Sequence, residues 1–243
     1  IPLSEGVFTI DKTKIFVPFD EATDDLQQRS TGSLLVEVQP FAVVTEKDIL
    51  LLDCGLGFSK KGQLQIHTNL KAAGIEPAHI TKVLLTHLHK DHAGGVSMKD
   101  RLGNYHLAFA NAAYYVQERE LMFADETGFP SYMAEELSAL HGHSQVALLQ
   151  ENEGLIDGYI HYEVTGAHSR YHQVFTIREK DEIIFFGGDD APQLQQMKNR
   201  FIAKYDYDGK KCMELRQQWW QQAYEEHWKF LFYHDIATPV LQC

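Results

Sequence analysis

Metal-binding side chains are crowded into one short segment of this chain, at His87, His89, Asp91 and His92. His87 and His89 are two residues apart just beyond an apolar run, Ile80 to Leu85. In an extended backbone their side chains therefore project to the same side. The pair Gly94-Gly95 follows and permits a sharp turn. Two imidazoles on one face make half of a tetrahedral metal site, and Asp91 and His92 add further ligand atoms.

The types of these side chains also indicate which metal ions the site would prefer. Imidazole and carboxylate together suit zinc, iron or manganese better than copper or calcium. The alternative interpretation is an exposed polar loop without an ion. We favour a metal site because the segment directly follows an apolar run of the kind expected for a buried strand.

The motif HxHxDH, here His87 to His92, resembles the signature of the metallo-β-lactamase superfamily. Later segments of the chain resemble the other sequence motifs of that superfamily, and they follow one another in the same order. Thr165 to His172 resembles the loop that places a ligand at His168. Phe185 to Asp189 resembles the strand that ends in Gly-Asp, and Phe230 to Asp235 resembles the late strand that ends in a histidine, His234. The resemblance extends over nearly the whole chain.

The resemblance implies two divalent ions, with Zn²⁺ first and iron or manganese as alternatives. One ion would be held by His87, His89 and His168, and the other by Asp91, His92 and His234, with Asp189 bridging. Three protein ligands for each ion plus a shared carboxylate leave room for a bridging hydroxide, whose pKa the two cations lower into the neutral range. Asp91 is the expected catalytic residue, which positions the hydroxide and passes its proton to the leaving group.

The region from Gly187 to Asp235 and the segment from Phe109 to Gln117 resemble the branch that contains N-acyl-homoserine lactone lactonases and organophosphate hydrolases. This implies hydrolysis of an ester or lactone, with N-acyl-homoserine lactones among the candidates. Some of those lactonases place a tyrosine three residues after the bridging aspartate, where this chain has Pro192. Two alternatives stay open: a phosphotriester or phosphodiester hydrolase that uses the same ions, and a non-catalytic metal-dependent ligand sensor.

Several residues outside the motifs have two interpretations. Asp53 ends the apolar strand from Ile49 and resembles an aspartate that orients a ligating imidazole, although a turn aspartate would look the same. Asp190 is passed over because the Gly-Asp register favours Asp189, and His172 is expected to be structural. The other histidines have no ligand-like spacing, and we expect them on the surface or on the faces of helices. Aromatic residues such as Phe123, Trp219 and Trp228 could line an apolar pocket, but large aromatics are more often part of the core.

Composition excludes several function classes. The chain has 22 basic and 34 acidic residues, so 22 minus 34 gives a formal charge of −12, which disfavours nucleic acid as a partner. No run of eighteen apolar residues is present, so we expect no membrane span. We therefore expect a cytoplasmic protein with a small-molecule substrate, while its start at Ile1 leaves room for a removed leader. A homodimer is a candidate assembly.

The elements that must position these residues alternate between strands and helices. Strands are predicted at residues 6–10, 14–17, 33–38, 41–44, 49–53, 80–85, 159–164, 173–178, 182–186 and 229–233. Helices are predicted at residues 63–73, 111–124, 132–150, 192–203 and 210–227. Strands followed by helices, twice over, favour an α/β fold, and we expect one domain over residues 1–243. The resemblance specifies a four-layer αβ/βα sandwich, in which two mixed sheets pack face to face with helices outside.

Overall fold

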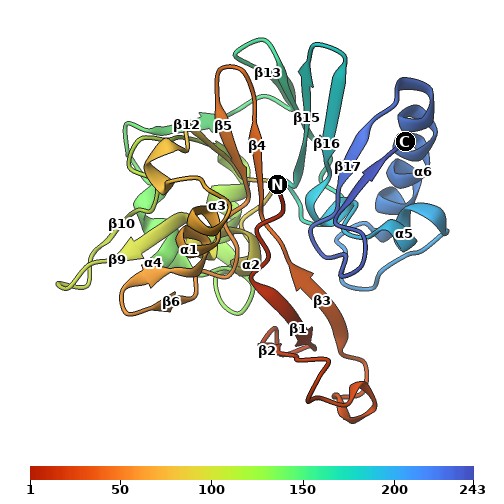
Figure 1. Cartoon of the computed structure of the whole chain (residues 1–243), viewed down its shortest axis with the longest axis horizontal. Coiled ribbons are helices and arrows are strands. Elements are labelled where there is room, and N and C mark those ends of the chain that lie inside the picture. The colour runs from red at the N-terminus through yellow and green to blue at the C-terminus, as the bar shows by residue number, and fades with distance from the viewer.

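Two mixed β-sheets lie face to face at the centre of the molecule (Figure 1). The structure is a computed structural model that describes residues 1–243. The first sheet contains, in spatial order, β12 (Val146–Leu149), β11 (Ala113–Gln117), β8 (Lys82–Leu84), β5 (Ile49–Leu52) and β4 (Phe41–Val44). The second contains β13 (Glu153–Ile156), β14 (Ile160–Val164), β15 (Gln173–Glu179), β16 (Glu182–Phe186), β17 (Lys229–Leu231) and β18 (Val240–Gln242).

Helices cover the outer faces of both sheets. On the side of the first sheet lie α1 (Gln65–Ala72), α3 (Glu118–Thr127) and α4 (Ala134–Leu137), and on the side of the second lie α5 (Leu194–Lys198) and α6 (Gly209–Glu226) (Figure 1). The four-layer αβ/βα arrangement expected from the sequence is therefore confirmed. No helix of this structure has the length and apolar character needed to cross a membrane.

The strand sequences explain why both faces are covered. In β5, Leu50 and Leu52 point into the core between the two sheets, whereas Leu51 packs into the core beneath the helices, near Ile66 of α1. A strand buried on both faces must be apolar at every position, because successive side chains alternate between faces. Each buried leucine of this kind contributes about 1.5–3 kcal/mol relative to an exposed one.

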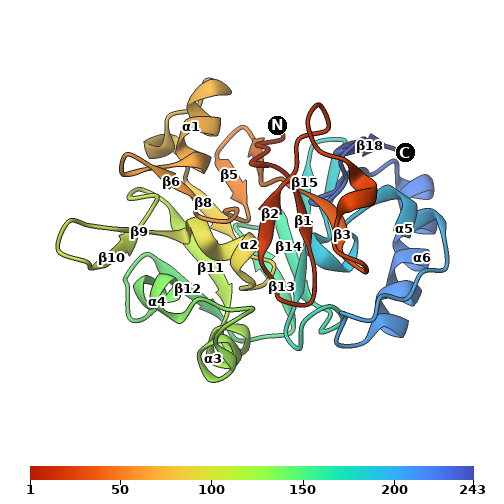
Figure 2. The same cartoon turned by 90° about the horizontal axis from the view of Figure 1, so that it is seen from below.

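A smaller sheet of three strands projects from one end of the sandwich (Figure 1). It contains β2 (Phe16–Pro18), β1 (Gly6–Ile10) and β3 (Leu34–Val38), all antiparallel (Figure 2). Phe8, Val36 and Val38 of this sheet join the core between the two large sheets. Two further strand pairs lie at the periphery: β6 (Ser59–Lys60) with β7 (Gln63–Leu64), and β9 (Ser97–Lys99) with β10 (Tyr105–Leu107).

Two of the predicted helices are wrong over much of their length. Residues 111–124 contain strand β11 followed by α3, because Tyr114 and Val116 are buried and β11 pairs in parallel with both β8 and β12. Residues 132–150 contain the short α4 and then β12. Gly142, with a φ of 63°, separates the two in a conformation that ends a helix.

Two further boundaries also need correction near the C-terminus. The helix predicted at residues 192–203 is confined to α5, and the carbonyl of Phe201 instead accepts a hydrogen bond from the side chain of Arg216 at 2.6 Å. The predicted strand at residues 229–233 ends at Leu231 as β17. It is followed by β18, which pairs antiparallel with it and forms the edge of the sheet.

Candidate metal centre

The segment Thr86 to His92 begins where β8 ends, at the edge of the first sheet. Thr86 donates from its backbone N–H to Asp53 Oδ1 and from its hydroxyl to Asp53 Oδ2, both at 2.8 Å. Asp53 follows β5, the parallel neighbour of β8, and has a φ of 54°. The segment leads into the short helix α2 (Lys90–Ala93). The two strand ends thus fix the backbone from which His87 and His89 project.

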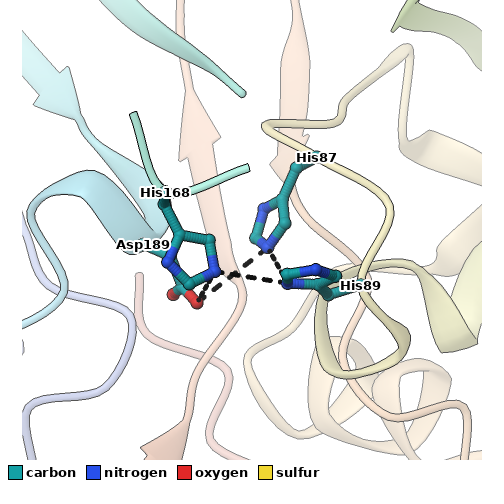
Figure 3. A group of neighbouring side chains, drawn as sticks. All are labelled: His87, His89, His168 and Asp189. Atoms are coloured by element: carbon teal, nitrogen blue, oxygen red, sulfur yellow. Dashed lines mark hydrogen bonds and ion pairs between the residues drawn. The ribbon is translucent and has the colours of Figure 1, made fainter. Parts of the chain in front are cut away.

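The first group of potential ligands comprises His87, His89, His168 and Asp189, whose ligand atoms all lie within 4.8 Å of one another (Figure 3). His89 Nδ1 lies 3.0 Å from His87 Nε2 and 3.2 Å from His168 Nε2. His168 comes from the loop between β14 and β15, 79 residues from His89 in sequence. Three imidazoles and a carboxylate therefore surround one point.

The second group comprises Asp91, His92 and His234. Asp91 Oδ2 lies 3.7 Å from His92 Nε2 and 3.5 Å from His234 Nε2. The ring of His92 also stacks on Tyr233, with centroids 4.0 Å apart and planes at 22°. The hydroxyl of Tyr233 donates to the carbonyl of Asp91 at 2.6 Å, which ties the end of the second sheet to α2.

Asp189 lies between the two groups, and each of its oxygens faces one of them. Oδ1 is 3.1 Å from His92 Nε2 and 3.0 Å from His234 Nε2, and Oδ2 is 3.1 Å from His168 Nε2. His92 Nε2 and Asp189 Oδ1 are buried and take part in no hydrogen bond. Buried polar atoms without such a partner are costly unless a cation lies between them. The donor set and these unsatisfied atoms fit a pair of divalent ions.

The outward nitrogen of four of these imidazoles has a partner of its own. His92 Nδ1 lies 2.7 Å from Asp53, and His168 Nδ1 lies 2.8 Å from Asp206. His234 Nδ1 lies 2.6 Å from the carbonyl of Glu37, and His87 Nδ1 lies 3.0 Å from the hydroxyl of Thr86. Such partners hold the proton on the outer nitrogen and leave the inner one free to ligate a metal.

Asp53 therefore has the contact expected from the sequence, whereas Asp206 was missed. Asp206 is 38 residues from His168, and nothing in its local spacing marks it as a partner of that imidazole. The only available signal was its place in the segment before α6.

Asp190 and His172 support the loop that carries His168. Asp190 accepts a hydrogen bond from the backbone N–H of His168 at 2.7 Å and from the hydroxyl of Thr165 at 2.5 Å. His172 Nδ1 lies 3.1 Å from Asp190, and His172 Nε2 accepts from the backbone N–H of Asp189 at 3.2 Å. Both side chains are fully buried and fix the relative positions of the two ligand-bearing loops.

The pKa values of the clustered histidines are shifted in two opposite directions. Burial and the neighbouring histidines hold the pKa of His87 and of His89 well below the ordinary value. Burial also acts to lower the pKa of His92, His168 and His234, but Asp189 and the other facing carboxylates together outweigh it and raise all three. The pKa of Asp189 is held well below its usual range, because the facing histidines overcome the effect of burial.

Five of the seven clustered side chains line a cleft of about 1090 Å³. His89, Asp91, His168, Asp189 and His234 contribute to its lining. Of the aromatic residues considered from the sequence, Phe123 lines the cleft, whereas Trp219 and Trp228 pack in the core under α6. The other aromatic lining residues are Phe16, Tyr132, Phe201, Tyr205 and Tyr207. Pro192 also lines the cleft.

Solved structures with the same fold cover nearly the whole chain. A probable metal-dependent hydrolase from Staphylococcus aureus has a TM-score of 0.77 at 22% identity, covering 100% of this chain and 91% of that one. AidC, a dizinc quorum-quenching lactonase in complex with a product, has a TM-score of 0.73 at 18% identity, covering 98% and 88%. The hydrolase AbOPH has a TM-score of 0.67 at 21% identity, covering 99% and 88%.

Sequence comparison gives the family directly. No curated protein matches the chain by sequence. A family model for the metallo-beta-lactamase superfamily, however, matches residues 36–209, a span that runs from β3 to the start of α6 and contains six of the seven clustered side chains. The chain therefore belongs to the metallo-beta-lactamase superfamily.

Proposed function

We propose that this protein is a dinuclear metal-dependent hydrolase that cleaves an ester or a lactone. The observation that carries the proposal is the position of Asp189, whose two oxygens face two separate histidine groups at 3.0–3.1 Å. Two divalent ions, of which Zn²⁺ suits these donors best, would supply an activated water molecule at neutral pH and polarise the bond to be cleaved.

We assign the protein ligands by group. His87, His89 and His168 would hold one ion, and Asp91, His92 and His234 the other, with Asp189 shared between them. Asp91 is the catalytic residue we propose, because its carboxylate belongs to the second group and also lines the cleft. From there it can orient the attacking water and pass a proton to the leaving group.

The cleft supports a small organic substrate with an apolar part. Ile10, Phe16, Leu34, Leu35 and Val36 form an apolar wall on the small sheet. Gln193 and Gln196 add polar groups to the lining of the cleft. The similar fold of AidC, a lactonase, makes N-acyl-homoserine lactones the first substrates to test. Because Pro192 has no hydroxyl, it cannot polarise a lactone carbonyl by hydrogen bonding.

A phosphotriester or phosphodiester hydrolase is the second candidate. Lys14, Lys90 and Arg170 line the cleft, and such basic groups favour an anionic phosphodiester. A ligand sensor without turnover is the third candidate, and it has no comparable support because binding alone does not require two groups of ligands open to a cleft.

Metal analysis combined with a substrate panel tests the proposal. We expect about two ions per chain, and turnover of acyl-homoserine lactones or aryl esters in preference to phosphotriesters and phosphodiesters. Asp189→Asn should lower the metal content and reduce kcat/KM by roughly 100-fold or more, because it weakens the only side chain that both groups share.

Asp181→Asn, in the exposed turn between β15 and β16, is the matched control and should retain both metal and activity. The ester or lactone proposal fails if the metal-loaded protein turns over no carbonyl substrate. The site assignment fails if Asp189→Asn keeps full metal content and activity.

A further inference from the structure

The cleft above the metal centre is rich in basic residues, although the chain as a whole carries a formal charge of −12. The basic side chains that line it are Lys12, Lys14, Lys90, Arg170 and Lys204. Four acidic residues also line it, but Asp91, Asp189 and Asp206 all face the clustered histidines. The fourth, Asp11, accepts hydrogen bonds from the N–H and the hydroxyl of Thr13, at 2.8 and 2.5 Å.

Lys14 and Lys90 reach this cleft from two different elements. Lys14 lies in the turn between β1 and β2, where its N–H donates to the carbonyl of Asp11 at 3.0 Å. Phe16 follows on β2 and lines the cleft. Lys90, the first residue of α2, places Nζ 5.8 Å from the centre of the Phe16 ring and 5.9 Å from that of Phe129. Figure 2 shows the hairpin of β1 and β2 beside α2.

Neither ammonium group has an anionic partner in the structure. Both side chains are only half-exposed, and neither takes part in any ion pair or side-chain hydrogen bond. Lys90 Nζ lies over two aromatic rings, and the nearby carboxylates of Asp91 and Glu136 attract it without forming an ion pair. A partly desolvated ammonium without a carboxylate gains more from an incoming anion than a solvated one does, because the local dielectric constant is lower. The two lysines are therefore ready to receive an anionic group.

The same region of the cleft is apolar next to these charges. Ile10 pairs with Phe16 across the hairpin, and Leu34 pairs with Ile10 on the other side. All three side chains line the cleft. A ligand that fits this surface needs an apolar arm along the small sheet and a negative charge near Lys14 and Lys90.

We propose that Lys14 and Lys90 form an anion subsite, and that the substrate is an ester or lactone whose apolar acyl arm carries a carboxylate. This inference rests on the proposed hydrolase function, and it adds that a neutral ester of the same shape is a poorer substrate. Lys14 and Lys90 are then specificity-determining residues, which act on the acyl arm rather than on the reacting bond.

A matched pair of substrates tests this subsite. One is 4-nitrophenyl hydrogen adipate, whose acyl arm ends in a free carboxylate, and the other is its neutral methyl ester. We expect the zinc-loaded protein to prefer the anionic substrate by about tenfold in kcat/KM, with a preference that shrinks as the salt concentration rises.

Two variants remove the charges with little disturbance of the fold. Lys14→Gly acts at a residue with a φ of 59°, a conformation that glycine adopts freely. Lys90→Met keeps an unbranched side chain over the two aromatic rings. Each variant should lower the ratio of anionic to neutral kcat/KM by roughly threefold, and the double variant should bring it close to one. Lys210→Met, on the exposed start of α6, is the control and should leave the ratio unchanged.

A binding measurement separates the subsite from the reaction. Hexanesulfonate has an apolar arm and an anion that ligates metals weakly, and its binding to the zinc-loaded protein can be titrated by calorimetry. We expect its Kd to rise by roughly tenfold in the double variant.

Equal turnover of the two adipate esters by the unmodified protein would overturn the subsite and leave the hydrolase proposal intact. If neither ester is cleaved and the acyl-homoserine lactones are inert as well, the hydrolase proposal fails. In that case the titration with hexanesulfonate is the remaining test of the anion subsite. An equal Kd in the unmodified protein and in the double variant would contradict the subsite.

Discussion

At the scale of single residues, most clustered imidazoles are fixed by a second contact on the side facing away from the cleft. Two of these partners are carboxylates, Asp53 on His92 and Asp206 on His168. A carboxylate in this position fixes the tautomer and the ring orientation, and it makes the inner nitrogen a stronger ligand. The strength of metal binding therefore depends on residues that need not touch the metal.

Asp206 gives the sharpest test of this dependence. Asp206→Ala removes the acceptor from His168 Nδ1 and should weaken zinc binding by roughly 10–100-fold, as measured by competition with a chromogenic chelator. Asp206→Asn keeps an oxygen acceptor without the charge, so it should restore part of the affinity. Equal zinc affinity in all three proteins would show that Asp206 has no positioning role. Asp181→Asn is again the surface control.

At the scale of elements, α6 anchors the segment of residues 189–207. This segment carries Asp189, and many of its residues line the cleft. Arg216 of α6 is only 1% exposed. Its guanidinium donates to the carbonyls of Asp190 and Phe201, at 3.0 and 2.6 Å, and to Gln196 Oε1 at 3.2 Å. No carboxylate forms an ion pair with it. Arg216 thus satisfies two backbone carbonyls and one side-chain oxygen of this segment.

Replacing Arg216 should destabilise this segment and lower the stability of the folded chain. Arg216→Met leaves three acceptors, two of them buried, without this donor and should lower the free energy of unfolding by about 2–4 kcal/mol. In a chain of this size that corresponds to a fall in Tm of roughly 5–15 °C, which thermal unfolding followed by circular dichroism would detect. Arg200→Met, at an exposed position close to the same segment, should change Tm by no more than about 2 °C. Equal shifts in the two variants would contradict the anchoring role.

At the scale of the whole molecule, the metal centre links the two halves of the sandwich. His87, His89, Asp91 and His92 come from the end of the first sheet, whereas His168, Asp189 and His234 come from the loops of the second. Any ion bound by both sets stabilises their packing, because it binds the folded chain and not the unfolded one.

Zinc should therefore raise the stability of the metal-free protein. At a free concentration of 100 times Kd the gain is about 2.7 kcal/mol, or roughly 5–10 °C in Tm. The same concentration of Ca²⁺ should have little effect, because imidazole-rich sites suit calcium poorly. No shift in Tm on removal of metal with a chelator and addition of zinc would contradict a shared metal centre.

The zinc effect should also depend on pH. Burial acts to lower the pKa of His168 and of His234, but Asp189, together with Asp206 at His168 and Asp91 at His234, raises both above the ordinary 6.5. Their protonated forms stabilise the metal-free fold. This contribution is fully present below pH 6.5 and is lost as the pH rises through the raised values. Zinc requires the neutral imidazoles, so the zinc-induced rise in Tm should be larger at pH 8 than at pH 6. An equal rise at both pH values would contradict this linkage.

Local patterns in the sequence determined the long strands and the chemistry of the site. Apolar runs such as Ile49 to Leu52 predicted buried strands, because a strand covered on both faces has no polar position. The ligand-type residues His87 to His92 were recognisable because they are adjacent in the chain. The same local patterns failed at residues 111–124 and 132–150, where the pairing of β11 with β8 and of β12 with β11 overrode an apparent helical spacing.

Only the tertiary structure decided which distant residues meet. Asp206 contacts His168 across 38 positions, and the Glu37 carbonyl contacts His234 across 197. Lys14 and Lys90 are brought to one cleft by a hairpin and a helix. Spacing along the chain predicts proximity only within one element, because the packing of two sheets depends on side chains spread over the whole sequence. The clustered side chains could therefore be proposed as ligands from the sequence, whereas their supporting contacts and the basic lining of the cleft required the folded chain.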